Sequence, residues 1–480
     1  MKSFRNRALA LFPGGSNGEF GIPPDLIPVI ERGEGCRVWD TDQREFLDMT
    51  MAWGAALIGH AHPKVLEEAT RQARRGANFA ALTRRSVELA ERLASICPCV
   101  ERIRFVASGT EATLLCLRVA HAATGRPKVL KFEGAYHGQH PVGVTSLLAD
   151  GKANFPEPDP SGTGAPWVER DVLVAPFNDL ATTEKIVSAR APEIAAVIVE
   201  PLHRCIVPRP GFLEGLRSIT QRFGIALIFD EVVTGFRLAL GGAQEYYGVT
   251  PDLVAYGKAL GGGFPIGAYG GRAELMEVVS EERLPGPNYA WSASTGGGNP
   301  VSAAAAFATL DLLSEKGIFD GLHAAGKKLR GAMADVLRAH GEVAQVLGDG
   351  PLAQVAFAGQ PITDQRSWLT SDRQRGRALM LELLKRGIFL NPMGTKLYLS
   401  LAHDEAAILR FTAALADGLV STLPLNRTAD GPRPQHVPAA AIGIGKSIAF
   451  VDCEAAATGD RSRSGSWPQR PSNSGGQDCP

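Results

Sequence analysis

The chain lacks an excess of charge of either sign. Its 480 residues carry 50 Lys and Arg against 50 Asp and Glu, so the formal net charge at pH 7 is zero. Because proteins that bind polyanions through charge carry a basic excess, this balance argues against a nucleic-acid-binding protein. Long apolar runs are missing too, since no segment approaches the roughly 18 apolar residues of a membrane-spanning helix. We therefore expect neither a nucleic-acid nor a membrane partner.

Cysteine is sparse and badly spaced for metal or redox chemistry. The chain has seven cysteines, no pair has zinc-type spacing, and Cys97 and Cys99 do not form a Cys-x-x-Cys redox motif. We expect no metal site, and an odd count in a long chain favours free thiols in a reducing compartment. The apolar stretch from Ala8 to Phe12 is too short for the core of a signal peptide. The expected location is therefore the cytoplasm.

What the chain does have is an alternation of strand-like and helical segments. Continuous apolar runs at 193–200 and 225–229 predict buried strands, with helical patterns at 111–123 and 212–222. Strands that alternate with helices predict an α/β domain with a mostly parallel sheet covered on both faces. Chemistry in such folds gathers at the carboxyl ends of the strands.

Composition divides the chain into four expected regions. Residues 1–50 form an N-terminal arm, rich in Gly and Pro and irregular up to about Ile30, followed by a hairpin. Residues 51–310 form a large domain, and residues 311–425 a smaller α+β domain. Residues 426–480 are rich in Pro, Ser, Gly and Arg with little apolar periodicity, which predicts a disordered tail.

Lys258 occupies an unusual place for a lysine. It follows a short apolar run, directly after Gly257, and three glycines at 261–263 come soon after it. A lysine held at the end of a buried strand loses hydration, so its pKa falls and its amine becomes a usable nucleophile. The alternative for this segment is an ordinary surface loop with a solvated lysine.

Two segments combine hydroxyl side chains with glycine ahead of a predicted helix. Ser108, Gly109 and Thr110 follow one strand, and free backbone N–H groups at such a helix start bind phosphate. Simple capping of the helix is the alternative, and for this segment alone it is favoured. Thr295 lies in the second segment, 291–300, for which a plain flexible loop is the alternative.

Aromatic and acidic side chains follow other predicted strands. Tyr136, which precedes His137, can stack on a planar ring or be an ordinary core tyrosine. Asp230 follows four apolar residues, where a buried carboxylate needs a partner such as a pyridinium nitrogen. A helix cap or an ion pair with Arg237 is the alternative. Glu200 ends the strand before it and is expected to orient its neighbours.

A phosphate site, a stacking aromatic, an aspartate, a lysine and a second phosphate contact, in that order, are what pyridoxal 5′-phosphate (PLP) requires. The chain resembles the class III aminotransferases, PLP-dependent enzymes of fold type I, and among them the branch that contains glutamate-1-semialdehyde 2,1-aminomutase. The segments that carry this resemblance are Leu57–Pro63, Ser108–Ala112, Tyr136–Gly138, Asp230–Arg237, Gly257–Gly263 and Gly297–Pro300. The resemblance implies a large domain with a mostly parallel, seven-stranded type of sheet, and a smaller C-terminal α+β domain.

The resemblance also implies a role for each site residue. Lys258 would hold the cofactor as a Schiff base, and Asp230 would pair with its ring nitrogen. Val232 and Tyr136 would cover the two faces of the ring. Thr295 would reach the phosphate from a neighbouring subunit, which implies a homodimer. The implied catalytic residues are Lys258, Asp230 and Tyr136, and the implied cofactor-binding residues are Ser108, Gly109, Thr110, Tyr136, His137, Glu200, Asp230, Val232, Lys258 and Thr295.

Substrate-side positions depart from the aminomutase pattern. Gly21 stands where an arginine for the substrate carboxylate is expected, with Glu19 nearby, and Thr395 stands where a glutamate is expected. The segment 200–208 is shorter than usual and lacks an expected asparagine. We therefore favour an aminotransferase that moves an amino group between an amino acid or amine and an oxo acid or aldehyde. The alternative is an aminomutase, which returns the amine to the adjacent carbon of the same molecule.

Some substitutes for the missing substrate contacts are present. His203 or Arg204 can stand in for the asparagine, and Arg237 is a weaker candidate for binding a carboxylate. Other protein classes fit parts of the pattern. A racemase or decarboxylase would use the same cofactor, whereas a non-catalytic homologue has no reason to keep both Lys258 and Asp230. A Schiff-base aldolase leaves the phosphate segments unexplained, and a dinucleotide enzyme lacks its Gly-x-Gly-x-x-Gly segment.

Overall fold

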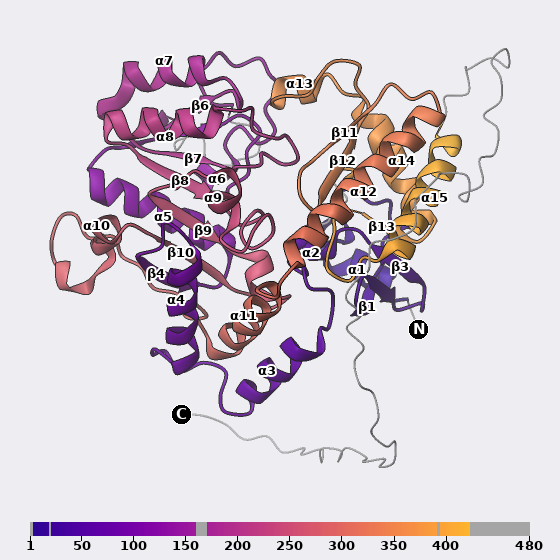
Figure 1. Ribbon diagram of the computed structural model, residues 1–480, viewed down its shortest axis with the longest axis horizontal. Coiled ribbons are helices and arrows are strands. Elements are labelled where there is room, and N and C mark those ends of the chain that lie inside the picture. Colours follow the sequence, from indigo (N-terminus) through magenta and orange to yellow (C-terminus); the bar gives the residue numbers. More distant parts are fainter. Residues whose placement is uncertain (1–2, 19–20, 160–169, 391–393, 423–480) are drawn as a thin grey trace, which may run out of the picture. The chain divides into compact units, whose positions relative to one another are not determined.

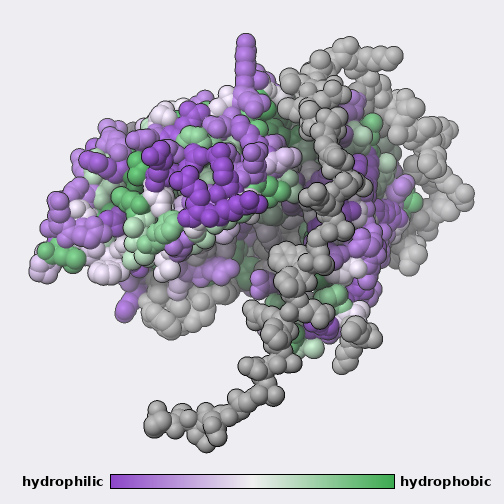
Figure 2. Space-filling view, turned by 90° about the horizontal axis from the view of Figure 1, so that it is seen from below, coloured by the Kyte–Doolittle hydropathy of each residue, from purple (hydrophilic) through white to green (hydrophobic). Residues whose placement is uncertain are grey.

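The computed structural model describes residues 3–18, 21–159, 170–390 and 394–422 (Figure 1). The tail expected at 426–480 and the acid Glu19 lie outside the described residues. No helix of the described ranges combines the length and the apolar character needed to cross a membrane. On the face shown in Figure 2, hydrophilic side chains cover much of the described surface, and apolar ones are scattered between them.

A seven-stranded sheet forms the centre of the large domain, in the order β4-β10-β9-β8-β7-β5-β6. Its strands are β4 (Arg102–Val106), β5 (Lys128–Phe132), β6 (Val172–Ala175), β7 (Ile194–Val199), β8 (Ala226–Asp230), β9 (Leu253–Tyr256) and β10 (Gly267–Gly271). Strands β6, β5, β7, β8 and β9 run parallel, and β10 is antiparallel to both β9 and β4. The mostly parallel sheet is thus confirmed. Strand β10 is absent from the prediction because its glycine-rich sequence has little β propensity.

The central strands are apolar on both faces because helices cover both sides of the sheet. Neighbouring residues of a strand point to opposite faces. Val129 and Ile198 therefore join the apolar cluster of α5 (Gly109–Thr124). Leu130 and Val199 join the cluster on the other face, which α8 (Phe212–Phe223) helps to build. Figure 1 shows α7 (Leu180–Arg190) beside α8.

The cluster that contains Leu130 and Val199 also receives three helices from other parts of the chain. They are α3 (Pro63–Ala73), α4 (Arg84–Ile96) and α11 (Pro300–Leu313). Helix α11 packs on both α3 and α4. Its alanine-rich sequence allows this close packing, because small side chains let helix backbones approach.

The N-terminal hairpin shares a sheet with a strand from the C-terminal part of the chain. Strands β1 (Ile30–Glu34), β2 (Arg37–Asp40) and β3 (Glu45–Asp48) are antiparallel, and β13 (Ile388–Phe389) pairs in parallel with β3. The predicted hairpin is therefore present. The arm before it is not irregular throughout, since Phe4–Leu11 forms α1 with Ser3 as its N-cap. That stretch contains no Gly or Pro, and a serine cap supplies an acceptor for the first turn.

The smaller domain is an α+β unit, as predicted. Strands β11 (Gln345–Leu347), β12 (Leu352–Ala356) and β14 (Lys396–Tyr398) form an antiparallel sheet. Helices α12 (Ile318–Ala339), α14 (Arg373–Lys385) and α15 (Glu405–Ser421) share an apolar cluster with it (Figure 1).

Short elements connect these parts of the chain. They are η1 (Pro13–Gly15), α2 (Met51–Gly54), α6 (Pro141–Val144), η3 (Ala191–Glu193), α9 (Gly242–Tyr247), η4 (Lys258–Gly261), α10 (Ala273–Met276), η5 (Glu277–Val279), η6 (Glu281–Arg283) and α13 (Gln365–Leu369).

Candidate active site

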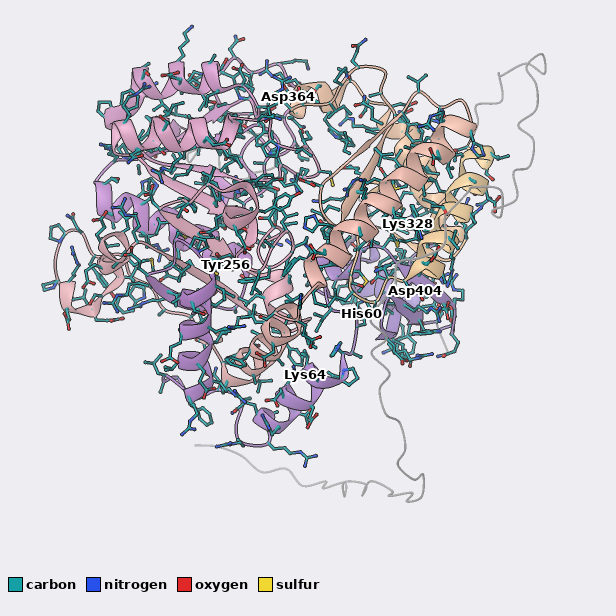
Figure 3. All side chains as sticks on the ribbon, viewed as in Figure 1. His60, Lys64, Tyr256, Lys328, Asp364 and Asp404 are labelled. Atoms are coloured by element: carbon teal, nitrogen blue, oxygen red, sulfur yellow. The ribbon has the colours of Figure 1, made fainter. Side chains whose placement is uncertain are left out.

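Predicted site residues converge at the carboxyl edge of the large sheet. Asp230 is the last residue of β8 and Glu200 follows β7, while Tyr136 and His137 follow β5. Lys258 follows β9, whose last residue, Tyr256, is labelled in Figure 3. These four strands are consecutive neighbours in the sheet. Because the carboxyl ends of parallel strands meet at one edge, segments far apart in the chain form one site.

Asp230 is held by a backbone amide and by a histidine. Its Oδ1 accepts a hydrogen bond from the N–H of Val232 at 3.1 Å, and its Oδ2 lies 2.8 Å from Nδ1 of His137. The Asp230 and His137 side chains are only 6% and 1% exposed. An ionised carboxylate offers about four acceptor positions, so this one keeps capacity for a further donor.

The ion pair between Asp230 and Arg237 that the sequence left open is not formed. Arg237 is fully buried, and its Nε donates to the carbonyl of Val233 at 2.9 Å. Its Nη2 donates to the carbonyl of Gly54, and its Nη1 has no hydrogen-bond partner among the described residues. The guanidinium therefore ties together backbone segments, and Asp230 stays free to meet another cation.

Lys258 combines an unusual backbone with an unpartnered amine. Its φ is +43°, in the left-handed region that residues with a side chain rarely adopt. Within the described ranges, the amine makes no hydrogen bond or ion pair with another residue. Burial lowers the pKa of Lys258 to about 8, although the charge of Asp230 acts in the opposite direction. Strained backbone of this kind clusters at functional sites, and the lysine is not a solvated surface group.

Gly109 allows three segments of the site to approach one another. A Cβ on Gly109 would lie 2.7 Å from Cγ1 of Val232, and one on Gly257 would lie 3.3 Å from Cα of Gly109. The start of α5, Val232 and the loop of the lysine are therefore in direct contact. A side chain at either glycine would therefore force its neighbours to move.

The start of α5 is capped by a serine side chain, as the sequence favoured, and it also has backbone N–H groups without an acceptor, here called open amides. Oγ of Ser108 accepts from the N–H of Glu111 at 3.2 Å. The N–H groups of Gly109 and Thr110 have no acceptor among the described residues. Two open amides at the positive end of a 16-residue helix fit a phosphate group.

Glu200 anchors the segment of Tyr136. Its Oε1 accepts from the backbone N–H of Tyr136 at 2.9 Å and lies 3.9 Å from Nε of Arg204. Burial alone raises the pKa of Glu200, but the opposing charges, of which Arg204 is the largest, outweigh it and bring that pKa to about 2. The guanidinium of Arg204 lies 5.7 Å from the centre of the Tyr136 ring. Glu200 is thus an ionised support for the residue expected to stack on the cofactor.

His203 and Arg204, the two candidates in the short segment after β7, have different environments. His203 is 1% exposed, stacks on Phe177 at 4.8 Å, and neither ring nitrogen has a hydrogen-bond partner in the described chain. Burial lowers the pKa of His203 to about 4, so its ring is neutral. Arg204 is the charged member of the pair and the one beside Tyr136.

Thr295 lies on the surface next to the start of α5. Its carbonyl accepts from Nδ2 of Asn78 at 2.7 Å, and the hydroxyl of the preceding residue, Ser294, donates to Oε1 of Glu111 at 3.1 Å. Glu111 belongs to the first turn of α5. Within one chain, therefore, the segment of Thr295 reaches the first turn of α5 through Ser294, and Thr295 does not bond to the open amides.

Gly21 and Thr395, two positions that depart from the aminomutase pattern, offer no side-chain group to a ligand. Gly21 has a φ of +77°, and its carbonyl accepts a hydrogen bond from Arg377. Thr395 is buried, and its hydroxyl donates to the carbonyl of Val355 at 2.6 Å. Both residues serve the packing of the fold, so neither replaces the arginine or the glutamate.

Two buried lysines escaped the sequence analysis. Lys131 is fully buried at the penultimate position of β5, and its amine donates to the carbonyls of Ala135, Val142, Gly143 and Thr145 at 2.6–3.2 Å. It thereby fixes the loop that carries Tyr136. Lys396, in β14, is 8% exposed and has no such partner. A charged residue within a short apolar strand is the sequence signal that both lysines share.

The open amides of α5, the unused acceptor capacity of Asp230 and the unpartnered amine of Lys258 are three complementary features. They suit a phosphate, a protonated ring nitrogen and an aldehyde carbon, respectively. PLP carries all three groups. The residues present therefore fit this cofactor, and the site is that of a fold-type I PLP enzyme.

The chain belongs to the class III aminotransferases, whose family model, "Aminotransferase class-III", matches residues 23–414. It is 40% identical over 433 residues to the glutamate-1-semialdehyde 2,1-aminomutase of Roseiflexus castenholzii, with coverage of 88% of this chain and 98% of that protein. It is similar in structure to an omega-transaminase from Sphaerobacter thermophilus, with a TM-score of 0.81, 36% identity and coverage of 87% and 96%. A beta-phenylalanine aminotransferase from Variovorax paradoxus gives a TM-score of 0.77, 30% identity and coverage of 87% and 92%. The chain is a PLP-dependent enzyme.

Proposed function

We propose that the enzyme transfers an amino group between two different molecules, from an amino acid or amine to an oxo acid or aldehyde. The unpartnered amine of Lys258 at the edge that also holds Asp230 is the observation that carries this proposal. Gly21 and Thr395 support transfer over an aminomutase, because neither offers the arginine or glutamate expected of that enzyme. The 40% identity to an aminomutase over most of both chains keeps intramolecular transfer as the second candidate.

The residues that would hold PLP follow from the geometry at the sheet edge. When bound, PLP supplies an aldehyde carbon that takes up amines and a protonated ring that withdraws electrons. The amides of Gly109 and Thr110, with the hydroxyl of Ser108, would bind its phosphate. The carboxylate of Asp230 would keep the proton on the ring nitrogen, because an adjacent anion favours the charged form. Val232 would pack against the ring.

The protein side of the reaction rests on the amine of Lys258. A base is most effective when its pKa lies near the working pH, and burial brings the pKa of Lys258 to about 8. We assign Nζ of Lys258 the removal of the proton from the substrate carbon that bears the amine. Tyr136 would shield the site from the other side, in the position that Glu200 fixes through its 2.9 Å hydrogen bond.

A donor-only experiment tests the proposed reaction. The purified holoenzyme is mixed with each of a panel of amino donors, without an acceptor, and the oxo product is quantified. An aminotransferase yields about one equivalent of oxo product per subunit, whereas a racemase or decarboxylase yields none. Glutamate-1-semialdehyde is included, and its conversion at full turnover without any second substrate would establish the aminomutase instead. Lys258→Ala abolishes the oxo product, and Lys316→Ala, on the exposed surface, serves as the matched control.

We also propose that two copies of the chain complete each site. The exposed hydroxyl-glycine segment of Thr295, which contacts the start of α5 through Ser294, supports this assignment. Lys258→Ala and Thr295→Ala chains, each impaired alone, are mixed under conditions that exchange subunits. A mixed dimer has one site with both residues intact, so activity returns. Mixed dimers without recovery, or a monomer by light scattering, would refute the proposal.

A cytoplasmic location is proposed as well, since five described cysteines are buried and free.

A further inference from the structure

Lys396 is a buried cation without a counter-ion. Its side chain is 8% exposed, and in the described part of the chain it forms neither a hydrogen bond nor an ion pair. Nζ of Lys396 lies 5.1 Å from the centre of the Tyr398 ring. Burying an ammonium group without hydrogen bonds is costly unless a partner is supplied. A ligand is the natural source of that partner.

Lys396 lies within electrostatic range of the candidate active site. Its charge acts on the pKa of Lys258 and on the pKa of Glu200, so it lies within electrostatic range of both. Arg237 lies over the same Tyr398 ring, 5.6 Å from its centre. The charges of Lys396, Arg237, Asp230 and Glu200 all act on the pKa of Lys258, and the charge of Arg204 acts on the pKa of Glu200. This end of the site attracts an anion.

We propose that Lys396 binds the carboxylate of the amino donor and so sets the enzyme's preference for amino acids over plain amines. The inference rests on the proposed function, because it names the substrate class of that site. Lys396 would supply the positive charge of the arginine that is expected at position 21, where this chain has Gly21. Lys396 and Tyr398 are two residues apart in β14, so their side chains lie on the same face of the strand. Thr395, just before the strand, donates to the carbonyl of Val355, whereas Nζ of Lys396 lies over the ring of Tyr398.

Arg237 is less suited to this task than Lys396. It is completely buried, and two of its nitrogens already donate to backbone carbonyls. Lys396 has all three of its N–H donors free within the described ranges, on a flexible stem that can reach a ligand. Arg237 instead makes a second cationic contact with the Tyr398 ring.

Paired donors that differ only in the carboxylate test the assignment. The pairs are beta-phenylalanine with 1-phenylethylamine, and alanine with ethylamine. In Lys396→Met, the KM of the carboxylated donors should rise about 10-fold to 100-fold, the usual effect of losing a hydrogen bond to a charged group. The KM of the plain amines should stay within about twofold, and Lys396→Arg should restore much of the preference. Lys328→Met is the control, because Lys328 lies in the smaller domain (Figure 3) and its amine donates to Glu405.

Three outcomes would overturn the assignment. They are an equal loss for both members of a pair, an unchanged preference, and a weakened affinity for PLP in Lys396→Met, which would give the lysine to the cofactor. A wild-type enzyme that transfers no amino group would refute the proposed function alone. In that case, the role of Lys396 is tested by calorimetric measurement of 3-phenylpropanoate binding to the holoenzyme. Binding about tenfold weaker in Lys396→Met supports the assignment, and equal binding or none by the wild type overturns it.

Discussion

His137 and Asp230 join the ends of two strands of the large sheet through a buried contact of 2.8 Å between Nδ1 and Oδ2. The two residues lie far apart in the sequence. The other ring nitrogen of His137, Nε2, has no hydrogen-bond partner in the described chain. The amide of Val232 holds the second carboxylate oxygen. Asp230 is therefore oriented before any ligand arrives, which is a requirement for a precise binding site.

Replacing His137 should loosen this carboxylate. His137→Ala leaves Asp230 with the Val232 amide as its protein donor, and the loss of a hydrogen bond to a buried charge costs about 1.5–3 kcal/mol. We expect the dissociation constant of PLP to rise about tenfold or more in fluorescence titrations of the apoenzyme. His137→Asn, whose Nδ2 can occupy the place of Nδ1, should retain more affinity. Equal affinities for the wild type and His137→Ala would contradict the role assigned to the contact.

The absence of a side chain at Gly109 should be as important for the enzyme as its open backbone amide. In Gly109→Ala the new Cβ would meet Cγ1 of Val232 at 2.7 Å, and such overpacking costs about 1–3 kcal/mol. Val232→Ala removes the clashing atoms, so the double variant should regain part of the lost stability. A thermal-denaturation double-mutant cycle measures this coupling. Gly321→Ala in α12, where a Cβ meets nothing within 4 Å, is the control, and strictly additive effects would count against the predicted clash.

The amine of Lys258 should capture PLP most rapidly above about pH 8. Only the unprotonated amine reacts, so the second-order rate of PLP uptake by the apoenzyme should rise with pH and level off once the pKa of about 8 is passed. The negative charge of Asp230 raises the pKa of Lys258, so Asp230→Asn should move the midpoint to lower pH. The positive charge of Lys396 lowers it, so Lys396→Met should move the midpoint upward. Stopped-flow absorbance gives the profile, and a midpoint near 10.5 would show an ordinary solvated lysine.

Glu200 should contribute to resistance against acid. Its pKa in the folded enzyme is about 2, below its ordinary value of 4.5, because opposing charges, chiefly that of Arg204, outweigh the effect of burial. A carboxylate with a depressed folded pKa stabilises the protein above its unfolded pKa, and this contribution is lost as the pH falls from about 4.5 toward about 2. In Glu200→Gln, Tm should therefore fall less steeply between pH 6 and about pH 3.5. Calorimetry checks this against Glu67→Gln at an exposed position, and parallel curves for Glu200→Gln and the wild type would disprove it.

The sequence by itself determined the class of this enzyme. Continuous apolar runs and helical periodicity predict the parallel strands, and Asp230, Lys258 and Tyr136 each come just where a predicted strand ends. Such local patterns are sufficient because secondary structure and the position of a strand end depend mainly on neighbouring residues. The residue types then point to the cofactor, since few ligands call for a lysine, an aspartate and a phosphate site together.

Only the tertiary structure decided which charges are buried and which groups they meet. The pairing of β13 with β3, the antiparallel β10 and the contact between His137 and Asp230 all join segments far apart in the chain. Thr395 turned out to bond inward, and Lys396 turned out to be a buried cation that has no hydrogen-bond or ion-pair partner among the described residues. Burial and charge balance are sums over all neighbours in space, and no local pattern contains them.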